Sequence, residues 1–151
     1  MTSPIPSFYR IWFTIVDPIL ASSGLLGNLF VPGTALRTYT PNAVLPPAPE
    51  TTMLLDTTAG FFAAVMFLSI VLLRARPTDF GLWRMVMFSI LLVDIAILGG
   101  LARLLRAEGR TNPVAWRPEE WVNFVITAGV AVIRTAFCLG VGMGSQALKR
   151  D

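Results

Sequence analysis

Histidine is absent from this chain of 151 residues, and cysteine occurs once, as Cys138. Without histidine there is no imidazole for a Ser-His triad, for acid-base catalysis near neutral pH or for the usual zinc sites. A single cysteine excludes a disulfide framework within one chain. The sequence also lacks a phosphate-binding loop, because the glycine-rich stretch 140–144 has no strand-turn-helix context. We therefore expect no metal and no cofactor.

Charge is scarce as well. Only 14% of the residues are charged and 54% are hydrophobic, whereas a soluble domain has about 25% charged residues. Four apolar stretches, at about 8–31, 53–73, 80–102 and 120–142, each approach the ~20 residues that cross a membrane as a helix. The sequence predicts an all-α, four-helix transmembrane bundle that forms a single integral membrane domain over residues 1–151.

Two features of the chain ends and loops bear on its location. The first stretch could be a cleaved signal peptide, but Arg10 is its only early positive charge and Asp17-Pro18 interrupts its apolar centre. The net charge of +3 comes from arginines beside the span ends, which indicates membrane anchoring and no nucleic-acid partner. Basic residues are spread almost evenly over the two sides, so the positive-inside rule decides little. We expect the protein to reside in the endoplasmic reticulum membrane with both termini in the cytosol.

Ionisable groups inside the spans are the strongest functional signal. A charge near the bilayer centre costs at least ~2.5 kcal/mol, so it must face a partner, a cavity or a substrate. At ~1.5 Å per residue, Asp17 and Arg134 lie at similar depth, which predicts a structural ion pair. Anchoring of a polar substrate group is the alternative for this pair. Asp94 falls in the opposite half of the membrane, where no basic residue is clearly available.

Three carboxylic acids are candidates for catalysis. Of two carboxyls in a low-dielectric pocket, one is expected to stay protonated, which gives a general acid beside a base. We predict Asp94 as the acid, Asp56 as its partner or base, and Glu120 in reserve. Structural alternatives stay open for each. Asp94 would be hydrogen-bonded to a neighbouring helix, Asp56 would be a charge at a helix start, and Glu120 would be a helix cap.

Small and polar residues recur every three or four positions along the first and fourth spans. This spacing places them on one helix face, which points inward because lipid cannot satisfy polar groups. The two stripes are Asp17, Ala21, Gly24 and Asn28, and Asn123, Thr127, Arg134 and Cys138. We predict Asn28, Asn123 and Thr127 as substrate-binding residues.

Three short motifs carry a family resemblance: Phe8-Tyr9-Arg10 before Asp17-Pro18, Trp83-Arg84 leading to Asp94, and Arg134-Thr135-Ala136-Phe137 running into 139–142. With them the chain resembles a fungal family of small four-span membrane proteins that often accompany natural-product pathways. The resemblance implies a lipophilic polyketide or terpenoid substrate. The architecture is also analogous to integral membrane terpene cyclases and sterol-isomerase-like proteins. Their catalytic residues do not carry over, because the chain is shorter than those cyclases and lacks the isomerase histidine.

These observations predict a membrane biosynthetic enzyme that uses buried carboxylates for cyclisation, epoxide opening or isomerisation. Its expected partners are the lipid bilayer, a lipophilic small-molecule substrate, and either a second copy of the chain or other biosynthetic membrane enzymes. One alternative is a non-enzymatic lipid-binding, sterol-binding or scaffold membrane protein. Another is a small proton-coupled transporter, which would have to oligomerise.

Overall fold

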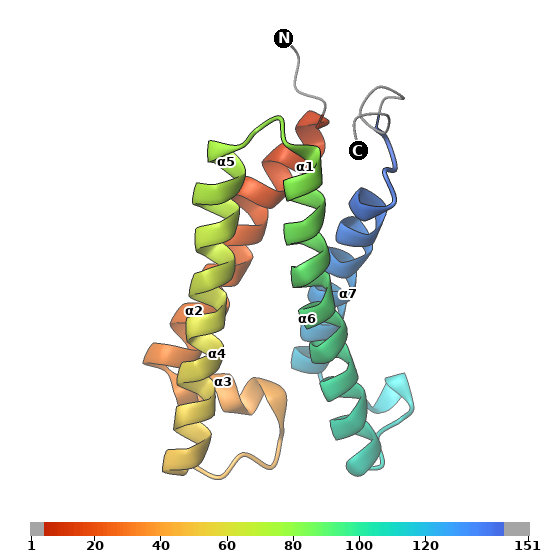
Figure 1. The fold of residues 1–151 in the computed structure, drawn as a ribbon. Helices are drawn as coiled ribbons and strands as arrows, with labels where there is room; N and C mark the ends of the chain where they lie inside the picture. The colour runs from red at the N-terminus through yellow and green to blue at the C-terminus, as the bar shows by residue number, and fades with distance from the viewer. Residues whose placement is uncertain (1–4, 144–151) are drawn as a thin grey trace. The chain divides into compact units, whose positions relative to one another are not determined.

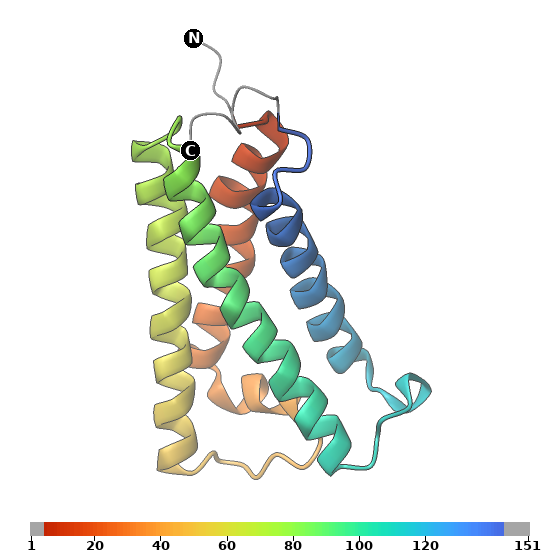
Figure 2. The ribbon, with the colours of Figure 1, turned by 45° about the vertical axis from the view of Figure 1, so that its right-hand side comes forward.

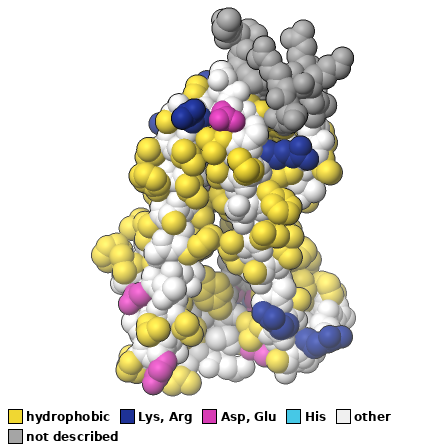
Figure 3. All heavy atoms as spheres, viewed as in Figure 1, with side chains coloured by type: hydrophobic (Ala, Val, Ile, Leu, Met, Phe, Trp, Pro, Cys, Tyr) yellow, Lys and Arg dark blue, Asp and Glu magenta, His cyan; other side chains and the backbone are white. Residues whose placement is uncertain are grey.

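The computed structural model describes residues 5–143, and these residues form helices and connections without any strand. Four helices are long and apolar enough to cross a membrane (Figure 1). They are Ser7–Phe30, Pro49–Ala75, Phe80–Ala107 and Pro118–Cys138. The predicted all-α fold with four spans is therefore confirmed. Side chains along the spans are largely hydrophobic at the surface, and charged ones gather toward the span ends (Figure 3).

The first two spans each contain a π-helical turn. The first consists of α1 (Ser7–Ile11), the π turn η1 (Trp12–Val16) and α2 (Asp17–Phe30). The second consists of α4 (Pro49–Phe67), the π turn η2 (Leu68–Leu72) and α5 (Leu73–Ala75). Pro18 lies two residues after the end of η1 and cannot donate a backbone hydrogen bond, so an irregular turn shortly before it lets the helix continue through the proline.

The chain divides into two compact units, and the first comprises residues 1–83 and 142–151. Within it, α2 packs along α4 and η1 lies against η2 (Figure 2). The approach is close at Gly24, where an added Cβ atom would lie 2.7 Å from the Phe62 ring. Asp17, Ala21 and Asn28 are buried on α2, which agrees with the inward stripe predicted for this helix.

The second unit, residues 84–141, contains most of α6 (Phe80–Ala107) and all of α7 (Pro118–Cys138). A non-helical connection with one short 3-10 helix separates them. Gly109 adopts a positive φ of 69°, and the Asn112 side chain accepts from the Val114 amide at the start of the 3-10 helix η3 (Pro113–Ala115). α7 begins at Pro118, near the predicted start at about 120, with proline and two acidic residues in its first turn.

Three boundaries differ from the sequence prediction. The proline-rich first connection favours an extended or irregular chain, but it contains the helix α3 (Pro32–Tyr39). Its proline lies in the first turn, where a helix needs no backbone N–H donor. The second span begins at Pro49 for the same reason. The last span ends at Cys138, because Gly140 and Gly142 adopt positive φ values of 76° that an α-helix cannot contain.

Candidate functional site

Asp94 and Arg134 form a buried ion pair inside the second unit. Arg134 Nη1 donates to Asp94 Oδ2, and the two residues are 3% and 7% exposed, respectively. Asp94 continues a buried stripe of α6 that includes Met87 and Ile90, and Arg134 lies between buried Val130 and Phe137 of α7. Both side chains therefore point into the contact between the two helices.

This ion pair corrects the expectation that no basic residue reaches Asp94. The depth estimate compared backbone positions, and the 3.9 Å contact of the Cys138 thiol with the Arg84 carbonyl oxygen is consistent with the level spans that it assumed. Asp94 is ~15 Å along the helix from Arg84, and Arg134 is ~6 Å from Cys138. The two side chains bridge the remaining ~9 Å, since an arginine side chain extends far from its backbone.

Asp17, the predicted partner of Arg134, belongs to the other unit, where it is buried at 4% exposure on α2. Its ion pair with Arg134 stays a prediction. The predicted substrate-binding residues divide in the same way. Asn28 is buried in the first unit, where its amide nitrogen donates to the Gly24 carbonyl. Asn123 and Thr127 are half-buried on α7.

Glu120 is fully buried at the start of α7, where its carboxylate accepts four hydrogen bonds. Arg110 donates from Nη1 at 2.6 Å and from Nη2 at 2.7 Å, which is the bidentate geometry of a strong charge-assisted pair. The backbone amide and Nε of Arg117 donate the other two, both at 2.9 Å. Arg110 also pairs with Glu108.

These contacts make Glu120 a clamp between the end of α6 and the start of α7. The Arg110 guanidinium donates hydrogen bonds to Glu120 and to Glu108. These bonds, the one to Glu120 most strongly, raise the pKa of Arg110 above its ordinary value. An ionised carboxylate offers about four acceptor positions, and all of those of Glu120 are used. This arrangement supports the helix-cap alternative and leaves no free lone pair for proton abstraction.

Asp56 lies exposed on α4 and has no ion-pair or hydrogen-bond partner for its side chain among residues 5–143. It is in the first unit and Asp94 is in the second, so their action as an acid-base pair stays a prediction. Within the described part of the chain, no group of three or more His, Cys, Asp or Glu residues could hold a metal ion.

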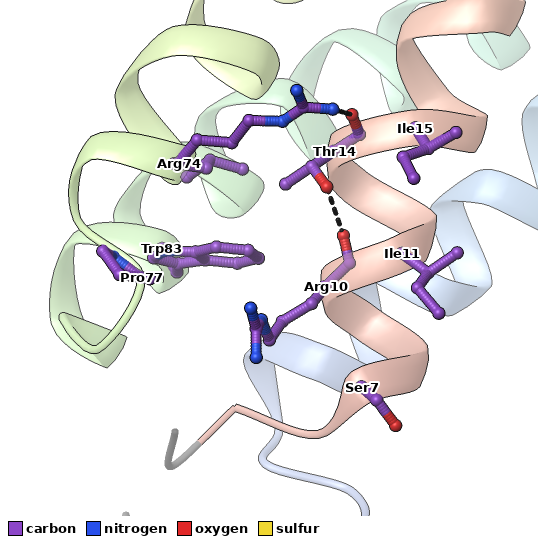
Figure 4. A pocket seen from close by; sticks show the side chains of 9 residues that line it. Ser7, Arg10, Ile11, Thr14, Ile15, Arg74, Pro77 and Trp83 are labelled. Carbon is purple, nitrogen blue, oxygen red and sulfur yellow. Dashed lines mark hydrogen bonds between the residues drawn. The ribbon is translucent and has the colours of Figure 1, made fainter. Parts of the chain in front are cut away.

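The first unit contains a hollow that the sequence did not reveal. Its volume is about 600 Å³, and it lies where the first span begins and the second ends (Figure 4). Arg10 and Arg74 lie on the same side of the α1–η1 helix as Trp83, whereas Ile11 and Ile15 lie on the other side. The remaining lining residues are Ser7, Thr14, Leu73 and Pro77.

Among residues 5–143, the hollow is lined by two guanidinium groups and no carboxylate, so this lining is positively charged. Arg74 Nη2 donates to the Thr14 carbonyl oxygen at 2.8 Å, so the second span is tied to the π turn of the first. Trp83 is 1% exposed and its indole nitrogen donates to the Arg76 carbonyl at 2.8 Å, which fixes the ring as a wall. Neither Arg10 nor Arg74 forms an ion pair within residues 5–143.

The sequence signals for this hollow were present but ambiguous. Arginines beside span ends are common membrane anchors, so Arg10 and Arg74 were not distinguished from the others. The pairing of η1 with η2, which brings the two together, depends on contacts between separate helices. π-helical turns often occur at functional sites, but they cannot be predicted from the sequence pattern of a membrane helix.

No curated protein and no solved structure matches the chain. A family model described as a domain of unknown function, DUF7704, matches residues 2–144. This match spans nearly the whole sequence and includes all four spans and the hollow. The chain therefore belongs to the DUF7704 family of domains.

Proposed function

We propose that this protein is a non-enzymatic integral membrane protein that binds an amphiphilic lipid or sterol at the membrane interface. The observation that carries the proposal is the lining of the hollow in the first unit. Apolar side chains stand beside two guanidinium groups that have no ion-pair partner in residues 5–143. Such a mixture suits a ligand with a polar head and an apolar body.

The surroundings of the carboxylic acids support binding over catalysis. A general acid needs a proton to donate, and a general base needs an available lone pair. Asp94 accepts a hydrogen bond from Arg134, so it is not a proton donor in this contact, and the carboxylate of Glu120 is occupied by four hydrogen bonds. Asp56 lies exposed on α4. The cyclase, isomerase or epoxide-opening reaction and its link to fungal natural products stay predictions.

The proposal is tested by what the purified protein retains and what its host converts. After purification in mild detergent and extensive washing, we expect mass spectrometry to find about one lipid or sterol molecule per chain. The metabolite profile of the host should be the same with wild type, Asp94→Asn and Asp56→Asn, with protein abundance measured in parallel.

Two results would overturn this function. The first is a washed protein that carries no lipid or sterol above the level of empty detergent micelles. The second is accumulation of a lipophilic precursor with Asp94→Asn at normal protein abundance, which would instead support the predicted acid-base enzyme.

A further inference from the structure

The hollow indicates which chemical group its ligand carries. Two guanidinium groups line it, and no acidic side chain does so in the part of the chain that the structure describes. Arginine presents planar donors that match the oxygens of phosphate, and guanidinium–phosphate hydrogen bonds are among the strong charge-assisted ones. Arg74 donates one hydrogen bond to the Thr14 carbonyl oxygen, which orients the arginine side chain and leaves its other N–H groups for a ligand.

The surroundings of the two arginines favour a ligand supplied by the membrane. Arg10 stands near the start of one span and Arg74 near the end of the next, so both lie at the same membrane surface. Below them, Ile11, Ile15 and Ile19 follow at intervals of four residues along the first span and are 55%, 47% and 63% exposed. These side chains form an apolar ridge that leads from the hollow toward the membrane interior.

Resting on the proposed function, we propose that the hollow binds the phosphate of an anionic phospholipid through Arg10 and Arg74. Trp83 bounds the head group on one side, and its hydrogen bond to Arg76 keeps the ring in place. A lipid whose phosphate carries net negative charge is preferred, because no carboxylate of residues 5–143 lines the hollow to offset the two arginines. The protein thereby selects lipids by head-group charge.

The first experiment uses the wild-type protein in nanodiscs of phosphatidylcholine with either phosphatidic acid, oleic acid or cholesterol added. Native mass spectrometry then counts the molecules that each protein keeps after release from the disc. We expect phosphatidic acid to be kept at least tenfold more than phosphatidylcholine at equal abundance. Equal retention of the two phospholipids would overturn the inference, as would equal retention of oleic acid, which offers a carboxylate.

The second experiment compares matched charge variants. Arg10→Gln/Arg74→Gln removes both guanidinium groups of the hollow, whereas Arg103→Gln/Arg106→Gln removes two exposed arginines at the other end of a span and changes net charge equally. We expect about a tenfold loss of phosphatidic acid retention for each arginine of the hollow and none for the control. Equal behaviour of the two double variants would overturn the assignment.

Inorganic phosphate distinguishes a lipid head group from a free ion. Added at millimolar concentration to lipid-free protein, it should raise the unfolding temperature much less than phosphatidic acid does, and an equal rise would overturn the lipid assignment. The wild-type selectivity experiment does not depend on whether the Arg10→Gln/Arg74→Gln variant folds. Retention of a neutral lipid or a sterol alone would refute this inference and leave the proposed function intact. Retention of nothing would refute both.

Discussion

A charged side chain inside a membrane helix is tolerated when an opposite charge neutralises it, and Asp94 and Arg134 do this for each other. The sequence identified both residues as anomalous, because each interrupts an apolar span. It did not identify their pairing, because the depth estimate compared backbone positions and left out the length of the two side chains. A long arginine side chain bridges much of the ~9 Å that separates the two positions along the helices.

We predict that removing one member of this pair destabilises the second unit. Arg134→Met should lower the free energy of unfolding by roughly 3–5 kcal/mol, because Asp94 is left as an uncompensated buried charge. The double variant Asp94→Leu/Arg134→Met should lose less than Arg134→Met alone, since apolar pairs replace buried ion pairs at little cost. The measurement is unfolding by SDS in dodecyl maltoside micelles, followed by circular dichroism. Strictly additive losses would contradict the ion pair.

The predicted contact of Arg134 with Asp17 is open to a related double-mutant cycle. If Arg134 also neutralises Asp17, Asp17→Asn costs stability in the wild-type protein and costs less in the Arg134→Met background. We expect a coupling free energy of about 0.5–3 kcal/mol, the range for residues of one ion-pair network. A coupling of zero in the same SDS titration would remove Asp17 from the network.

The clamp at Glu120 gives a prediction for the third connection. Arg110→Gln should lower the free energy of unfolding, because the fully buried carboxylate loses its bidentate partner and keeps only the donors of Arg117. Arg106→Gln is the matched control on an exposed site and should change it by no more than about 0.5 kcal/mol. Hydrogen exchange of the first turn of α7 should accelerate in the first variant alone. Equal exchange in both variants would show that the clamp carries no stability.

At the scale of helices, length and apolar composition were enough to predict four spans, and proline and charge patterns placed the start of α7. Helix interruptions were harder to predict. α3 was missed because a short helix in a proline-rich connection leaves little periodic signal. The π turns η1 and η2 were missed because their sequences, WFTIV and LSIVL, read as ordinary membrane helix. A π turn changes the backbone hydrogen-bond register of the helix, and the hydrophobicity of the residues does not indicate such a change.

The contact of α2 with α4 can be tested at its closest point. Gly24→Ala places a methyl group 2.7 Å from the Phe62 ring, so it should lower the free energy of unfolding by about 1–3 kcal/mol. Gly27→Ala, one turn away, meets no atom within 4 Å and should be neutral or stabilising by up to ~1 kcal/mol. Adding Phe62→Leu to Gly24→Ala should recover part of the loss. Equal effects of the two alanines would mean that the helices do not approach at Gly24.

For the whole molecule, composition predicted a membrane-spanning protein, and single residues stood out as charged groups within or beside apolar spans. The function depends on which of these charged side chains contact one another. The sequence favoured carboxylates, because Asp94, Asp56 and Glu120 stood out against apolar surroundings. The fold places Asp94 and Glu120 against arginines and leaves Arg10 and Arg74 beside an open hollow. An arginine at a span end has the same local sequence whether it anchors the helix or faces a ligand, so this difference emerges only in three dimensions.

Four successive spans predict a defined membrane topology. Three exposed connection residues, Asn42, Thr78 and Thr111, can each be replaced by cysteine in a Cys138→Ser background. Because every span reverses the side of the chain, the cysteines at 42 and 111 should react together with a membrane-impermeant maleimide, and the cysteine at 78 should react from the opposite side. With the expected cytosolic termini, only the cysteine at 78 is labelled in sealed microsomes. Labelling of 78 and 111 from one side would mean that α6 does not cross the membrane.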